Sequence, residues 1–90
     1  MDNELLYLYD HTEDTRTRFI SFVGQTNRFD LAITSTDNFF GKKLVVSIQS
    51  GRAAIIGTDD LEEEGYIAHA FQLSEPEAQE LTSFLEEVIV

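Results

Sequence analysis

Residues 74–90, SEPEAQELTSFLEEVIV, carry the complete pattern of a helix and decide how the rest of the chain is interpreted. Ser74 and Glu77 form a capping-box pattern, in which each side chain binds the backbone amide of the other residue. Pro76 falls in the first turn, where a helix does not need its missing N–H. The following apolar residues recur every three or four positions and share one helix face: Ala78, Leu81, Phe84, Leu85, Val88 and Ile89. The pattern predicts an amphipathic helix over residues 74–90.

Alternation of apolar and polar residues predicts that most of the chain before this helix is β-strand. The expected strands are residues 5–9, 17–23, 28–36, 43–49, 53–56 and 66–73. Residues 28–36 alternate most regularly, with Phe29, Leu31 and Ile33 expected to point inward. Residues 43–49 and 53–56 are expected to form a hairpin across a two-residue turn at Ser50-Gly51.

The side chains expected in the core follow from these strands. In residues 43–49 the expected buried face is Leu44, Val46 and Ile48. Residues 66–73 would place Ile67, His69, Phe71 and Leu73 on one side. Between the two, the acidic residues 58–65 are expected to make one helical turn that Gly65 ends.

These elements predict an α+β fold, with an antiparallel meander of five to six strands and one C-terminal helix packed on the sheet. The strands lie within residues 4–73 and the helix over residues 74–90. Ninety residues are too few for a second hydrophobic core, so a single domain over residues 1–90 is expected.

Composition excludes several classes of protein. The chain has no cysteine, which excludes disulfides and thiolate metal sites. Residues 1–4 are acidic where a signal peptide is basic, and no apolar run approaches the ~18 residues of a membrane span. We therefore expect a cytoplasmic protein that does not bind membranes.

The charge is distributed unevenly. Residues 1–15 carry five acids and residues 53–90 carry ten, and neither stretch contains Lys or Arg; all six basic residues lie between residues 16 and 52. One interpretation is solubility and protection of sheet edges. The other is electrostatic contact between the acidic flanks and the basic middle, within or between chains. A net charge of −11 disfavours nucleic-acid binding, because phosphate repels such a chain.

The run from Thr17 to Leu73 contains a distinctive pattern, GKKLV…QSGR.AIIG.DDLEE.GY. With this pattern the chain resembles a family of short acidic proteins of unknown function from low-GC Gram-positive bacteria. The resemblance covers nearly the whole chain and implies a cytoplasmic setting. Because the family has no assigned activity, the resemblance supplies no catalytic residues.

The metal-site candidates are the polar residues Asp10, His11, Glu13 and Asp14. Carboxylates and imidazoles at this spacing bind a divalent ion when a loop brings them together. Such a site would make the protein a small-ligand or divalent-metal binding protein with a catalytic role. The spacing matches no standard metal-binding loop, however, and four polar residues between strands are typical of any solvated loop. The sequence contains no other catalytic or phosphate-binding motif, and no cofactor is expected.

Two further features have alternative interpretations. On an apolar strand face, His69 would be either a core residue with one hydrogen bond or a group with a perturbed pKa. The acidic run within residues 59–64 would be either a solvated turn or a binding site for a basic partner.

Both faces of the predicted sheet carry apolar residues, and one helix is too narrow to cover even one face. We therefore expect a homodimer, with a closed barrel as the rival explanation. The candidate interface residues are Ile20, Phe22, Phe39, Phe40, Val88 and Ile89. The predicted function is a non-enzymatic protein-interaction or adaptor module that works as a homodimer and can bind another protein.

Overall fold

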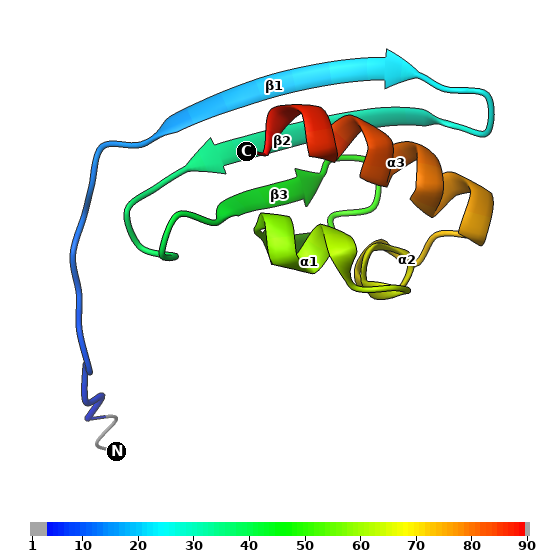
Figure 1. The fold of residues 1–90 in the computed structure, drawn as a ribbon. Coiled ribbons are helices and arrows are strands. Elements are labelled where there is room, and N and C mark those ends of the chain that lie inside the picture. The colour runs from blue at the N-terminus through cyan, green and yellow to red at the C-terminus, as the bar shows by residue number, and fades with distance from the viewer. Residues whose placement is uncertain (1–3, 90) are drawn as a thin grey trace.

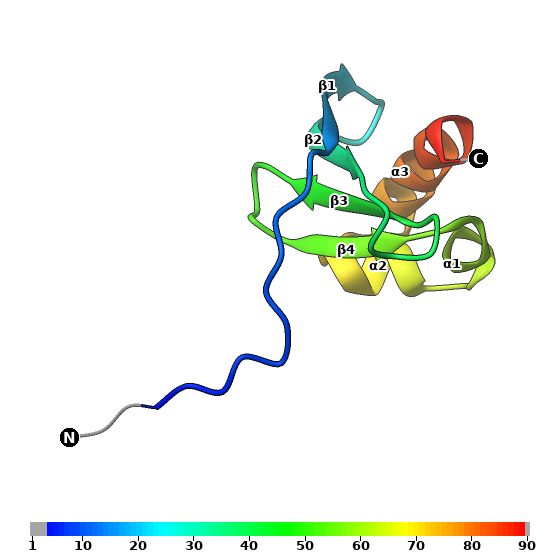
Figure 2. The ribbon, with the colours of Figure 1, turned by 90° about the vertical axis from the view of Figure 1, so that its left-hand side faces the viewer.

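The computed structural model describes residues 4–89 as four strands followed by three helices (Figure 1). The strands are β1 (Arg16–Val23), β2 (Arg28–Ser35), β3 (Lys43–Ser47) and β4 (Ala53–Ile56). They form one antiparallel sheet in the order β1-β2-β3-β4. The helices are α1 (Thr58–Glu62), α2 (Tyr66–Phe71) and α3 (Glu75–Val88). All three lie on the same side of the sheet (Figure 2), which confirms an α+β fold with an antiparallel meander and a C-terminal helix.

The sheet has four strands, so the prediction of five to six was wrong. Residues 5–9 form no strand and belong to an extended segment that leads away from the body (Figure 1). Residues 66–71 form α2 instead of a strand. Gly65 and Gln72, both in the left-handed region at φ 83° and φ 54°, bound this helix. Its buried residues, Ile67 and Phe71, are four apart, a spacing that fits a helix face as well as a strand face.

The prediction for the buried side of β3 was also wrong. Val45 is fully buried, whereas Leu44 and Val46 point to the other side and Ile48 is 53% exposed. The pairing register explains this, because Val45 lies between Ile33 of β2 and Ala54 of β4. Side chains that are paired across strands point to the same face of the sheet.

The β3–β4 turn is longer than the expected two residues. The Ser47 amide donates to the Arg52 carbonyl at 2.8 Å, which leaves residues 48–51 as the turn. Gly51 has φ 75°, a left-handed conformation that strains any residue with a Cβ atom.

Replacing Gly51 by valine is expected to lower the free energy of unfolding by about 1–2 kcal/mol, because a β-branched residue is strained at positive φ. Urea denaturation measures the change. Gly51→Asn is the matched control, since asparagine tolerates this conformation and should cost less. Equal unfolding midpoints for the parent and Gly51→Val would contradict the assigned turn.

Helix α3 begins as the sequence predicted. The Ser74 hydroxyl accepts from the Glu77 amide at 3.4 Å, and the Glu77 carboxylate accepts from the Ser74 amide at 2.9 Å. The helix ends at Val88, with Ile89 as its C-cap, and Val90 lies outside the described residues. The buried residues of α3 and its cap are Ala78, Leu81, Leu85 and Ile89.

The core lies between the sheet and the helices. Phe29, Leu31 and Ile33 of β2 point into it, as the alternation of residues 28–36 predicted. At the margin of the core, the ring centroid of Phe22 in β1 lies 5.1 Å from that of Phe29 and 4.5 Å from that of Phe84 in α3. The aromatic contacts join β1, β2 and α3.

The β1–β2 turn is tied to α3 by Glu80. Its carboxylate accepts from the backbone amides of Gln25 and Thr26 at 2.5 and 3.1 Å. The Thr26 hydroxyl also donates to it, and these hydrogen bonds lower the pKa of Glu80. A Cβ atom on Gly24 would clash with the Glu80 carboxylate, so a glycine at this position leaves room for that group. The contact holds α3 against one side of the sheet.

Candidate interaction surface

The side of the sheet that faces away from the helices, here called the outer face, carries two cross-strand rows. The first row is Phe19, Ala32, Val46 and Ala53. The second row is Thr17, Thr34, Leu44 and Ile55. In the second row the hydroxyls of Thr17 and Thr34 share a hydrogen bond of 2.8 Å. Six of these eight side chains are apolar, and no helix within residues 4–89 covers them.

Several large apolar side chains on and beside the outer face are open to solvent. Phe19 is 74% exposed, Val23 80%, Ile48 53% and Ile55 38%. Leu44 and Val46 at the centre of the sheet are half-buried by their neighbours in adjacent strands. Contiguous exposed apolar area of this kind is typical of an interaction site.

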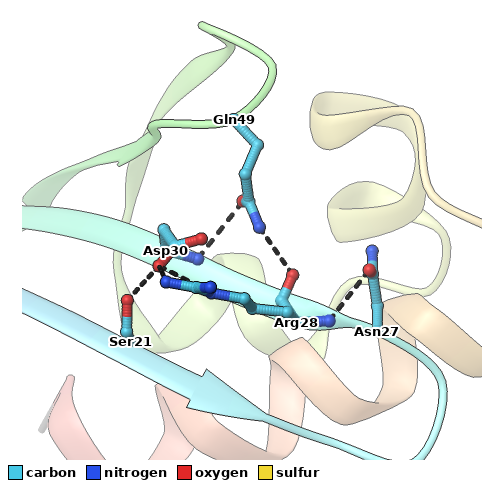
Figure 3. A network of polar contacts seen from close by, with 5 residues as sticks. All are labelled: Ser21, Asn27, Arg28, Asp30 and Gln49. Carbon is cyan, nitrogen blue, oxygen red and sulfur yellow. Dashed lines mark hydrogen bonds and ion pairs between the residues drawn. The ribbon is translucent and has the colours of Figure 1, made fainter.

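A network of polar side chains lies at one end of the outer face (Figure 3). Arg28 Nη2 lies 3.2 Å from Asp30 Oδ1, and the Ser21 hydroxyl donates to the same carboxylate. Gln49 donates to the Arg28 carbonyl at 2.7 Å and accepts from the Asp30 amide at 3.2 Å. The hydrogen bond from Ser21, with that from Arg28, lowers the pKa of Asp30. The charges at this end are thus paired with each other.

A second exposed apolar element precedes β1. Residues 4–15, here called the arm, lie away from the body (Figures 1 and 2). Five consecutive apolar side chains in it are exposed: Leu5 76%, Leu6 87%, Tyr7 69%, Leu8 90% and Tyr9 78%. The radius of gyration is 15.4 Å, whereas a compact chain of this length has about 12 Å. The arm accounts for the elongated shape of 53 × 30 × 24 Å.

The base of the arm is anchored by Glu13. Its carboxylate accepts from the Thr36 hydroxyl at 2.7 Å, the Asp37 amide at 3.3 Å and the Asn38 side-chain amide at 2.5 Å. The Thr36 hydrogen bond in particular lowers the pKa of Glu13. His11 Nε2 lies 3.5 Å from Glu13 Oε1. These contacts fix the base of the arm to the β2–β3 turn.

The four metal-site candidates are only partly brought together. His11 and Glu13 are neighbours, but Asp10 and Asp14 are exposed. Within residues 4–89, no group of three or more His, Cys, Asp or Glu side chains is placed to hold a metal ion. Both oxygens of Glu13 already accept hydrogen bonds from the β2–β3 turn. The geometry thus gives Glu13 the role of an anchor for the β2–β3 turn.

The expected interface residues divide into two groups. Phe40, in the β2–β3 turn, is 100% exposed and its neighbour Phe39 is half-buried. The other four pack against the core: Ile20, Phe22 and Val88 at its margin, and Ile89 within it. Ile20 and Phe22 lie on the helix side of the sheet because they are paired with the buried residues Leu31 and Phe29 of β2. Val88 and Ile89 are the last residue of α3 and its C-cap.

Two other sequence features lie on the surface. His69 is exposed, since it faces away from Ile67 and Phe71 around α2. Lys42 Nζ lies 3.4 Å from Asp59 and 3.0 Å from Asp60, so the acidic run is partly neutralised within the chain.

The outer-face residues Phe19, Val46 and Ile55 were not among the interface residues expected from the sequence. The sequence contains a signal for all three, because strands 17–23, 43–49 and 53–56 have apolar residues on both sides. Strand parity alone does not tell which side the helices cover.

A family model described as SAV0927-like matches residues 8–87. No curated protein matches the chain. Among the helices of residues 4–89, none combines the length and the apolar character that crossing a membrane requires.

Proposed function

We propose that this chain, which belongs to the SAV0927-like family of uncharacterised small proteins, is a non-enzymatic interaction or adaptor module that works as a homodimer. The observation that carries the proposal is the apolar outer face on a sheet whose other face three helices cover. Burial of such a face in a second protein surface removes apolar area from water.

A second copy of the chain is the partner that fits this face best. Two sheets pack face to face with their side chains interdigitated, about 10 Å apart and with strands roughly aligned. A twofold interface is self-complementary, so the apolar rows of one copy meet those of the other. The charged groups at the end of the face, Arg28 and Asp30, are already paired and can remain at the solvated rim.

The exposed Phe40 and the acidic run within residues 59–64 lie outside the paired faces and would be available to a further protein partner. We propose that the module works in the cytoplasm of a low-GC Gram-positive bacterium; the resemblance of the Thr17–Leu73 run supports the source, and the resemblance and the acidic residues 1–4 support the cytoplasm. The proposal assigns no catalytic step and no cofactor to the chain.

The test of the homodimer is the replacement of Phe19 by glutamate. The parent should sediment at twice the chain mass of 10.2 kDa at micromolar concentration. Phe19→Glu should sediment as a monomer, because two phenyl contacts are lost and two carboxylates are buried, at a cost of about 3 kcal/mol or more. The substitution should not unfold the monomer, since Phe19 is 74% exposed in it.

Ser83→Glu is the matched control, because it adds the same charge at an exposed position of α3. This variant should remain dimeric. A parent that sediments at the chain mass at micromolar concentration would overturn the homodimer, and equal association of the parent and Phe19→Glu would move the interface elsewhere.

A further inference from the structure

We propose that the arm of one copy adds as a strand to the free edge of β1 in the second copy, so that the two copies exchange their arms. This inference rests on the homodimer proposed above and names the segment that completes it. The arm residues concerned are 5–9, and the edge residues concerned are 19–23.

The area of the outer face is the first argument. Four strands of four to eight residues give a flat face of roughly 400 Å² at the usual strand spacing and rise. A stable dimer of standard size buries about 800 Å² on each partner. The outer face alone is therefore about half of what is needed. The two tyrosines of the arm can bury about 150–250 Å² each, and its three leucines add to that.

The arm has the composition of an added strand. Leu5, Tyr7 and Tyr9 alternate with Leu6 and Leu8, so both sides of an extended arm are apolar. A strand of this kind needs apolar neighbours on both faces of the sheet that it joins. At the edge of β1 it would find Phe19 on the outer side, and Ile20 and Phe22 on the helix side.

The edge of β1 is open in the described structure. β1 is the first strand in the sheet order, and no strand within residues 4–89 pairs with its outer edge. Eight residues of unpaired backbone, of which FISFV is the apolar part, form a template for strand addition. The opposite edge is less open, because β4 has four residues and the Tyr66 hydroxyl donates to its Ile55 carbonyl at 3.3 Å.

The charges of the two segments are complementary. Residues 1–15 carry five acids and no Lys or Arg. β1 carries Arg16 and Arg18, both exposed, and no acid. Pairing of the arm with β1 of the second copy brings the acidic segment next to this basic strand, and the opposite charges favour association of the two copies. Pairing of two arms would bring like charges together and is therefore disfavoured.

The direction of the arm favours exchange between copies over folding back within one chain. Glu13 is bound to the β2–β3 turn, on the side of β1 away from its free edge. Figure 2 shows that the arm runs from β1 past the ends of the other strands. It leads away from the sheet on the side that does not carry the helices. If the outer faces stack about a twofold axis parallel to the strands, β1 of the second copy lies over β4, in the direction that the arm takes. A return to its own β1 would break the Glu13 contacts.

The first test replaces Leu6 and Leu8 together by serine. Both side chains are at least 87% exposed in the single chain, so the fold of each copy should be unchanged. The dissociation constant of the dimer should rise by about 100-fold or more, because each of the two exchanged arms loses two leucine side chains. A control with Leu6→Met and Leu8→Met keeps the apolar volume and should bind like the parent.

The second test uses cysteine pairs, because the natural chain has no cysteine. Tyr7→Cys and Ser21→Cys chains are prepared separately, mixed and oxidised mildly, and the mixed disulfide is identified by its mass. The arm proposal predicts that this disulfide forms in preference to the one between Tyr7→Cys and the control Ser83→Cys on α3. Equal yields of the two disulfides would overturn the proposal.

The outcomes separate the arm from the outer face. If Phe19→Glu dissociates the dimer while the arm variants do not, the homodimer stands and the arm exchange is overturned. If the arm variants dissociate the dimer and Ile55→Glu, which places a charge on the outer face at β4, does not, the arm exchange stands without stacked faces. A parent that is monomeric at micromolar concentration overturns both.

Discussion

Replacing Leu85 by alanine is expected to lower the free energy of unfolding by about 3–5 kcal/mol. The side chain is 0% exposed, and its removal leaves a cavity between α3 and the sheet. A domain of this size has a total stability of about 5–13 kcal/mol, so the loss is a large part of it. Urea denaturation at one fixed protein concentration measures the difference, because a dimer would add a concentration-dependent contribution.

Glu86→Ala is the matched control for Leu85→Ala. Glu86 is the next residue of the same helix and is exposed, and alanine is a good helix former. Its effect should stay within about 0.5 kcal/mol of zero. Equal denaturation midpoints for Leu85→Ala and the parent would contradict the assignment of the buried side of α3.

The C-terminal helix could be predicted from the sequence because its determinants are local. Its cap requires only Ser74 and Glu77, which are three residues apart, and its buried side follows from the helical period. The inward residues of β2 were predictable for a similar reason. Phe29, Leu31 and Ile33 alternate with less apolar residues, so only one side of the strand suits the core.

The buried side of β3 could not be predicted in this way. Leu44, Val45 and Val46 are apolar in succession, so both sides of the strand suit a core. The decision comes from pairing, which places Val45 beside Ile33 and fixes the parity of the whole strand. Pairing of distant segments cannot be read from a local pattern.

The candidate interaction surface was predictable only in outline. Apolar residues on both sides of strands 17–23 and 53–56 indicated an uncovered face, and this led to the expectation of a homodimer. Which residues lie on that face depends on the side to which α3 packs, and Glu80 contributes to that choice by binding the β1–β2 turn. Residues 5–9 alternate like a strand, but alternation does not say whether the pairing strand belongs to the same chain.

The last prediction concerns α2, where the expected strand proved to be a helix. Replacing Phe71 by alanine should lower the free energy of unfolding by about 3–5 kcal/mol, because the ring is 3% exposed and packs in the core. Replacing His69 by alanine should change the stability by no more than about 0.5 kcal/mol, since this side chain is exposed. Urea denaturation of the two variants under the same conditions provides the comparison.

The pair of variants distinguishes a helix from a strand over residues 66–71. In a strand, His69 and Phe71 point to the same face, so both substitutions would disturb the core. In α2 they are two residues apart, about 200° around the helix axis, so only Phe71 reaches the core. A large loss of stability from both substitutions would contradict the helix. Loss from Phe71→Ala alone would support the helix, in which Phe71 lies on the buried side of α2 together with Ile67.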